Sequence, residues 1–148
     1  MNTLTAGTST VITNEAGNVT IASNIASKAR AYLTNTVTVT STAKVIGFDT
    51  EQYDNLNEFS TSTGVFTVNR GGYYQVNVNL YWSGATADQY YILNILKNGS
   101  AYSTTVIRAA TSADAGQFLG DIVQVSSGDT ISVSAQAGAS TNLSTSAA

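Results

Sequence analysis

A regular alternation of apolar and polar side chains over residues 72–83 is the clearest pattern in this chain. One set of side chains is apolar: Tyr74, Val76, Val78, Leu80 and Trp82. The set between them is polar apart from two tyrosines: Tyr73, Gln75, Asn77, Asn79 and Tyr81. Because successive side chains of a β-strand point to opposite faces, the pattern predicts a strand with one face in a core.

Two other segments are apolar on both faces. Residues 90–97 alternate two apolar sets, Tyr91, Leu93 and Ile95 against Tyr90, Ile92 and Leu96. Residues 118–125 are similar, with Leu119, Val123 and Val125 against Phe118 and Ile122. Only one face of a strand meets the core of a two-sheet sandwich, so the second face needs other cover. A neighbouring subunit is the simplest candidate.

Turn signals separate the apolar segments. They are Ser83-Gly84, Asn98-Gly99 and Ser127-Gly128-Asp129. Asn-Gly is the strongest short hairpin signal, because both residues tolerate a positive φ. Many strands, regular turns and no convincing long helix predict an all-β, antiparallel two-sheet sandwich.

Residues 1–27 differ from the rest of the chain, since they are small, hydroxyl-rich and free of aromatic residues. Residues 10–13 and 18–21 flank Asn14-Glu-Ala-Gly17, which predicts a hairpin with a four-residue turn. We therefore divide the chain into an N-terminal arm, residues 1–27, and a head, residues 28–148. The apolar residues of the arm are candidates for docking or strand addition: Val11, Ile12, Val19 and Ile21.

Composition removes several classes of function. The net charge of −3 and six scattered basic residues disfavour a nucleic-acid partner. With no histidine and no cysteine, the chain lacks Ser-His triads, thiolate sites and disulfides. No secretory signal or membrane-spanning run is present. We expect no enzymatic activity and no cofactor.

One acidic cluster requires separate consideration. It consists of Asp49, Glu51, Asp54 and Glu58. A calcium ion on a loop is one interpretation, but the alternating order of a dedicated calcium loop is missing. A solvated acidic loop is the favoured interpretation, so no metal site is predicted.

The aromatic spacing from Phe48 onward resembles a known family signature. Phe48, Asp54, Phe59, Phe66, Gly72 and Tyr74 follow one another as F-x5-D-x4-F-x6-F-x5-G-x-Y. This spacing resembles the complement C1q globular head, which shares its jelly-roll fold with tumour necrosis factor. The resemblance implies a homotrimeric jelly roll that displays or binds. Its fold-core residues here are Phe48, Phe59, Phe66, Gly72 and Tyr74, and Gly72 is expected where a side chain would clash.

Other segments extend the resemblance over roughly residues 30–135. Arg30-Ala-Tyr-Leu33, followed by Val45-Ile-Gly-Phe-Asp49, is similar to the start of such heads in phage fibre and particle proteins. The family normally closes with a final apolar strand, whereas residues 141–148 read TNLSTSAA. Either residues 141–145 make a poor final strand or that place is open. The arm hairpin is one candidate for filling an open edge.

The resulting functional hypothesis is a virion structural protein. It is a trimeric capsid decoration (cement) protein or a short head or tail fibre of a phage, docked through its arm on capsid or tail proteins. The expected trimer interface contains Tyr73, Tyr81, Tyr90, Ile92 and Leu96. The alternative is a receptor- or glycan-binding head that uses loops at residues 49–63, 84–89 and 111–116. No membrane partner is expected.

Overall fold

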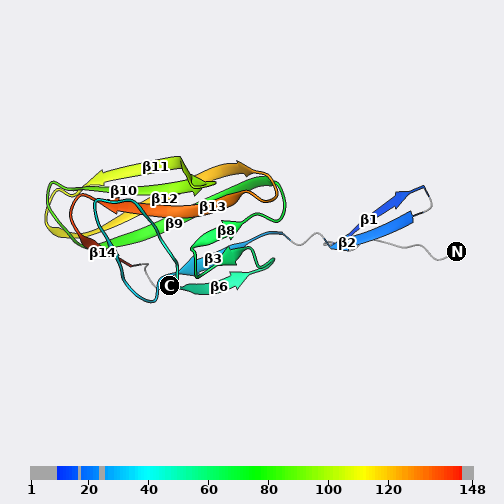
Figure 1. Ribbon diagram of the computed structural model, residues 1–148, viewed down its shortest axis with the longest axis horizontal. Helices are drawn as coiled ribbons and strands as arrows, with labels where there is room; N and C mark the ends of the chain where they lie inside the picture. The colour runs from blue at the N-terminus through cyan, green and yellow to red at the C-terminus, as the bar shows by residue number, and fades with distance from the viewer. Residues whose placement is uncertain (1–9, 17, 24–25, 145–148) are drawn as a thin grey trace.

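Two antiparallel β-sheets make up the body of the protein in the computed structural model, which describes residues 10–16, 18–23 and 26–144 (Figure 1). The first sheet has the order β11-β10-β13-β8-β7, and β5 pairs with β13 beside β8. Its strands are β5 (Lys44–Val45), β7 (Phe59–Ser60), β8 (Val65–Thr67), β10 (Tyr90–Lys97), β11 (Ser100–Arg108) and β13 (Thr130–Ala137). The second sheet has the order β12-β9-β14-β4. Its strands are β4 (Val37–Val39), β9 (Gly72–Ala85), β12 (Ala113–Val125) and β14 (Thr141–Ser144).

Two further strand pairs stand outside these sheets. β3 (Ala29–Tyr32) pairs with β6 (Thr50–Asp54) beside the sandwich, and β1 (Thr10–Glu15) pairs with β2 (Asn18–Ser23). Figure 1 shows the β1–β2 hairpin beyond one end of the sandwich. In this hairpin Glu15 pairs with Asn18, so the connection is two residues long and not the predicted four. The other residues of the predicted arm (1–9, 17 and 24–25) and residues 145–148 lie outside the described part of the chain.

The core is formed by the inward side chains of both sheets. The predicted alternation in β9 is confirmed, because Val78, Leu80 and Trp82 are buried while the side chains between them are exposed. The Trp82 ring meets the Tyr91 ring edge to face, with centroids 4.9 Å apart. Such a contact combines a large buried apolar area with favourable ring geometry.

A buried amide joins the two sheets at this point. Gln117 of β12 accepts a hydrogen bond from Trp82 Nε1 at 2.9 Å. Its Nε2 donates to the carbonyl oxygens of Tyr91 at 3.3 Å and Thr105 at 3.1 Å, in the first sheet. A buried polar group is costly unless it is hydrogen-bonded, and here both ends of the amide have partners.

The final strand forms, which answers the question that the sequence left open. β14 pairs with β9 on one side and β4 on the other, and Leu143 is fully buried opposite Trp82. The hypothesis that the arm hairpin takes this place is therefore wrong for residues 81–83 of β9, which β14 covers. Along residues 72–80, no strand in the described part of the chain pairs with that edge of β9.

The predicted core aromatics surround the start of β9. Phe48 is buried, and Phe59, Phe66 and Tyr74 pack against the core cluster. The Phe66 and Tyr74 rings meet at 62° with centroids 5.9 Å apart.

The expectation for Gly72 is wrong, since a Cβ added there would meet no atom within 4 Å. The crowded glycine in this region is Gly64, whose φ is +69° and whose added Cβ would lie 2.3 Å from the Ile46 carbonyl oxygen. Only glycine tolerates both conditions.

The turn signals had mixed outcomes. Asn98-Gly99 joins β10 to β11 with φ values of 51° and 77°, as an Asn-Gly hairpin turn requires. Ser83-Gly84 is not a turn, because β9 continues through it to Ala85. Instead the pairing with β12 shifts register between Ala113 and Ala115, so Gly84, with φ +70°, lies in an irregular stretch of the sheet.

Candidate subunit interface and docking surfaces

The outward face of β9 and β12 carries large apolar side chains in water. Tyr73 is 73% exposed, Phe118 62% and Ile122 59%. They belong to one surface, since Phe118 pairs with Asn79, Ile122 with Gln75 and Gln124 with Tyr73 across the two strands. Exposed aromatic and aliphatic side chains gathered on one sheet face indicate a protein contact.

A hollow lies in the middle of this β9/β12 face. Its lining includes Gln75, Asn77, Phe118, Gly120 and Ile122. A Cβ at Gly120 would lie 2.8 Å from Asn77 Oδ1 and 2.9 Å from the Phe118 ring. The Phe118 ring and the Asn77 side chain therefore pack over Gly120, and a larger residue at this position would displace them.

The five predicted interface residues are divided between two faces of the sandwich. Tyr73 and Tyr81 lie on the β9/β12 face, whereas Tyr90 and Ile92 lie on the outer face of β10 in the other sheet. A cyclic trimer joins two unlike surfaces of each subunit, so both faces can take part.

Leu96 does not fit the predicted interface, because it is only 8% exposed in the single chain. The β10–β11 pairing shifts register between Ile95 and Leu96, and this irregularity changes what surrounds Leu96. The sequence also contained a signal that the prediction missed. Phe118 and Ile122 stood out as apolar residues opposite a core-facing set, yet they were not included among the candidates.

Two of the three candidate binding loops come together at the end of the sandwich away from the hairpin (Figure 1). Asp114 accepts hydrogen bonds from Tyr81 Oη at 2.5 Å and from the Gly84 amide at 2.7 Å. The Ala87 amide donates to Ser112 Oγ at 3.1 Å. The hydrogen bond from Tyr81 lowers the pKa of Asp114, and Asp114 in turn raises the pKa of Tyr81. The segments around residues 84–89 and 111–116 are thus one polar surface.

The acidic cluster binds the protein's own amides. Asp49 accepts hydrogen bonds from the amides of Thr34 at 2.7 Å and Asn35 at 3.0 Å, which lower its pKa. Asp54 accepts from the Leu56, Glu58 and Phe59 amides. Glu58 is buried and accepts from the Asn69 amide at 2.7 Å. Three of the four carboxylates therefore hold loops in place. The interpretation as a solvated acidic loop is wrong for Glu58, which is buried because it satisfies the Asn69 amide.

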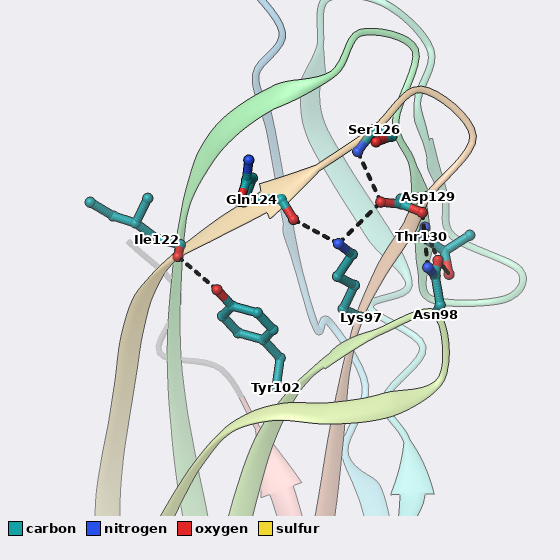
Figure 2. A network of polar contacts seen from close by, with 8 residues as sticks. All are labelled: Lys97, Asn98, Tyr102, Ile122, Gln124, Ser126, Asp129 and Thr130. Carbon is teal, nitrogen blue, oxygen red and sulfur yellow. Dashed lines mark hydrogen bonds and ion pairs between the residues drawn. The ribbon is translucent and has the colours of Figure 1, made fainter.

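At the hairpin end of the sandwich, one carboxylate joins two turns (Figure 2). Asp129 lies 3.3 Å from Lys97 Nζ and accepts hydrogen bonds from the Ser126 amide and from Asn98 Nδ2, both at 2.9 Å. Lys97 Nζ also donates to the Gln124 carbonyl at 2.8 Å. The Ser126 amide, then Asn98 and Lys97, lower the pKa of Asp129 to about 2. The β10–β11 and β12–β13 turns are fixed to each other by this network.

The fold is that of an all-β jelly-roll module, and one of its outward sheet faces carries exposed apolar side chains. The C1q domain model matches residues 30–147, and the chain belongs to the C1q-domain family. Such domains are typically non-enzymatic binding modules and commonly form homotrimers. The resemblance inferred from the aromatic spacing is confirmed.

A solved structure supports the same fold. The globular domain of zebrafish complement 1qA protein is similar with a TM-score of 0.61 and 14% sequence identity, covering 76% of this chain and 89% of that one. At this identity the likeness concerns the fold alone. A comparison with curated proteins found no match.

Proposed function

We propose that this chain is a homotrimeric attachment protein whose C1q-type head assembles through the β9/β12 face. The observation that carries this proposal is the exposure of Tyr73, Phe118 and Ile122 on one side of a folded sheet. Such residues are typical of the buried centre of protein interfaces. Tyr90 and Ile92, on the opposite sheet, supply part of the second surface that a closed ring requires.

The β1–β2 hairpin is the proposed docking arm. Ile12 pairs with Ile21 and Asn14 with Val19, so Ile12, Val19 and Ile21 share one face of the hairpin. Val19 and Ile21 are more than half exposed, as Val11 nearly is on the other face. An isolated two-stranded hairpin is marginally stable in water, which favours a functional state in which this apolar face is covered.

The proposed site of attachment is a virus particle, with the chain as a capsid decoration protein or a short head or tail fibre of a phage. The start of the head, Arg30-Ala-Tyr-Leu33 and residues 45–49, resembles phage fibre and particle proteins and supports this choice. Three arms on one trimer would combine weak contacts through effective concentration. A low-charge arm can gain affinity from main-chain hydrogen bonds.

The native mass of two proteins tests the assembly. We expect the full chain to have a native mass near three times 15.4 kDa, and a variant lacking residues 1–27 to have a native mass near three times its own smaller chain mass. A monomeric full chain at micromolar concentration would contradict the trimer. If only the shortened variant is monomeric, the arm is part of the assembly and the docking role is wrong.

Attachment needs a separate test. Particles that carry the full chain should withstand heating better than particles mixed with residues 28–148 alone, measured by release of nucleic acid. An antibody against the head should also label intact particles. Equal heat resistance and no labelling would contradict the virion assignment and leave the trimer unaffected.

A receptor- or glycan-binding head is the second candidate. The polar surface formed around Asp114, Gly84 and Ser112 lies at the end opposite the hairpin and favours this role. A glycan array probed with the arm-free head distinguishes the two functions. Selective binding that Asp114→Ala abolishes supports recognition, and an array with no signal supports pure attachment.

A further inference from the structure

An open groove of about 960 Å³ lies between β3 and β9. Residues 72–79 line one side without interruption, and residues 26–32 line the other. Successive residues of a strand point to opposite faces, so a groove lined by all of them follows the edge of the strand. This groove is therefore a slot between two strand edges.

Both edges are open in the described part of the chain. β9 pairs along its length with β12, but on its other side only Tyr81, Trp82 and Ser83 pair with β14. β3 pairs only with β6. Alternate residues of an antiparallel strand direct their N–H and C=O groups to each side. A strand placed in the slot can hydrogen-bond to both edges. It would join the β3–β6 pair to the sheet that contains β9.

The floor of the slot is apolar and belongs to the core. The side chains that form it come from several strands and loops: Phe48, Phe59, Phe66, Ile131 and Val133. Most of them pack in the buried core cluster or against it. An added strand with apolar side chains at alternate positions would extend this core, as in donor-strand complementation.

Positive charge is concentrated along the same slot. Three of the six basic residues, Lys28, Arg30 and Arg70, line it, although the chain as a whole has a net charge of −3. None of the nine Asp and Glu residues does so. Lys28 precedes β3 and Arg30 lies in it, and both are exposed. Arg30 donates a hydrogen bond to Gln52. The exposed Lys28 and Arg30 side chains favour a segment that carries carboxylates.

We propose that the slot receives an extended acidic segment of a partner protein by strand addition. About eight residues span the length of residues 72–79. Apolar side chains of the segment face Phe59 and Phe66, while its carboxylates face Lys28 and Arg30 at the rim. This inference goes beyond the proposed function and needs neither the virus particle nor the docking arm.

Two capped probe peptides of about eight residues test the proposal on the full chain. One alternates valine with glutamate, and the other has lysine in place of every glutamate. We expect the acidic peptide to bind about tenfold or more tightly than the basic one by fluorescence anisotropy, with the difference shrinking in high salt. It should also slow amide hydrogen exchange in β3 and in residues 72–80.

Matched variants assign the site. Lys28→Glu combined with Arg30→Glu should weaken binding of the acidic peptide about tenfold. Lys44→Glu, at an exposed position outside the slot, should change its affinity by less than about twofold. Unchanged melting temperatures show that the variants fold. Equal binding of both peptides, no binding of either, or protection outside β3 and β9 would overturn the proposal.

A final control concerns the chain's own residues. If a variant lacking residues 145–148 binds the acidic peptide and the full chain does not, the slot is occupied from within and the partner segment is excluded. Equal binding by both proteins supports the proposal. The charge-reversal variant and the shortened variant alter no residue of the β9/β12 face. Native mass measured in parallel therefore shows whether the trimer forms, independently of peptide binding.

Discussion

The two outward faces of the sandwich differ in whether their side chains have partners within the chain. On the first sheet, Thr104, Asn94 and Ser134 form a ladder across β11, β10 and β13, with hydrogen bonds of 2.7 and 3.1 Å. Ser134 is buried there. On the second sheet, Phe118 and Ile122 meet solvent. The first face therefore combines a polar ladder with exposed apolar side chains such as Val106, whereas the second concentrates its exposed apolar side chains on β9 and β12.

The exposed apolar side chains of the first face include Tyr90 of β10 and Val106 of β11. Tyr90 is exposed, and the Arg108 guanidinium lies 5.5 Å from the centre of its ring while pairing with Asp88 at 3.2 Å. An interface centred on β9 and β12, with Tyr90 near its edge, follows from this difference. Central apolar residues carry most of the energy of an interface, whereas rim residues contribute less.

The largest expected effect comes from charging the open face. Phe118→Lys combined with Ile122→Lys should raise the trimer dissociation constant by about 100-fold or more, because buried lysines would lose hydration. Analytical ultracentrifugation measures the change. Tyr53→Lys, at an exposed position in β6 outside the sandwich, is the control and should leave the trimer intact. Trimers that survive the double change would place the interface elsewhere.

Three glycines are compared next, and the most crowded of them is Gly64, which joins β7 to β8 in the first sheet. Gly64→Ala should lower the free energy of unfolding by about 3 kcal/mol, since a positive φ and a clash with the Ile46 carbonyl act together. Gly84→Ala has the same sign of φ and open space, so about 1 kcal/mol is expected. Gly72→Ala should be nearly neutral. Chemical denaturation that ranks the three differently would contradict this account.

The next effect on stability is expected from the Gln117 side chain, whose amide joins the two sheets. Gln117→Leu leaves the Trp82 N–H and the carbonyls of Tyr91 and Thr105 without this partner, and should cost about 2–3 kcal/mol of unfolding free energy. Gln75→Leu changes the same residue type on the exposed face of β9 and should cost less than about 0.5 kcal/mol. Similar losses for both variants would show that the bridge adds nothing.

A smaller effect is expected at the margin of the first face. Tyr90→Ala should weaken the trimer by about fivefold, well below the effect of charging Phe118 and Ile122. Tyr53→Ala, at an exposed tyrosine of β6 outside both faces of the sandwich, serves as the control. Sedimentation of both variants at several concentrations gives the two constants. A Tyr90 effect as large as the central one would mean that the two faces contribute equally.

The smallest expected effect is on the stability of the protein in acid. The pKa of Asp129 is lowered from 3.8 to about 2 in the folded chain, so its contribution is present above pH 4 and is lost as the pH falls from about 4 to 2. Asp129→Asn should therefore reduce the decrease in melting temperature over that interval. An unaltered acid profile for Asp129→Asn would contradict the role of the turn network.

Much of this fold could be read from local pattern. The alternation in β9, the Asn98-Gly99 turn and the aromatic spacing from Phe48 to Tyr74 depend on neighbours in the sequence, and all three have counterparts in the structure. The division of Tyr73 and Tyr90 between two sheets could not be read in this way. Strand pairing joins residues that are distant in sequence, and alternation carries no information about which sheet a strand enters.

The sequence by itself determined that this chain forms an antiparallel sandwich of the C1q type, because side-chain alternation is local to each strand and the aromatic spacing from Phe48 to Tyr74 follows the signature of the family. Tertiary structure alone decided which second faces stay open, that Leu96 is buried, that Gly64 and not Gly72 is the crowded glycine, and that a slot separates β3 from β9. Each of these depends on the distance between backbones far apart in the chain, and such distances are fixed only when the sheets pack.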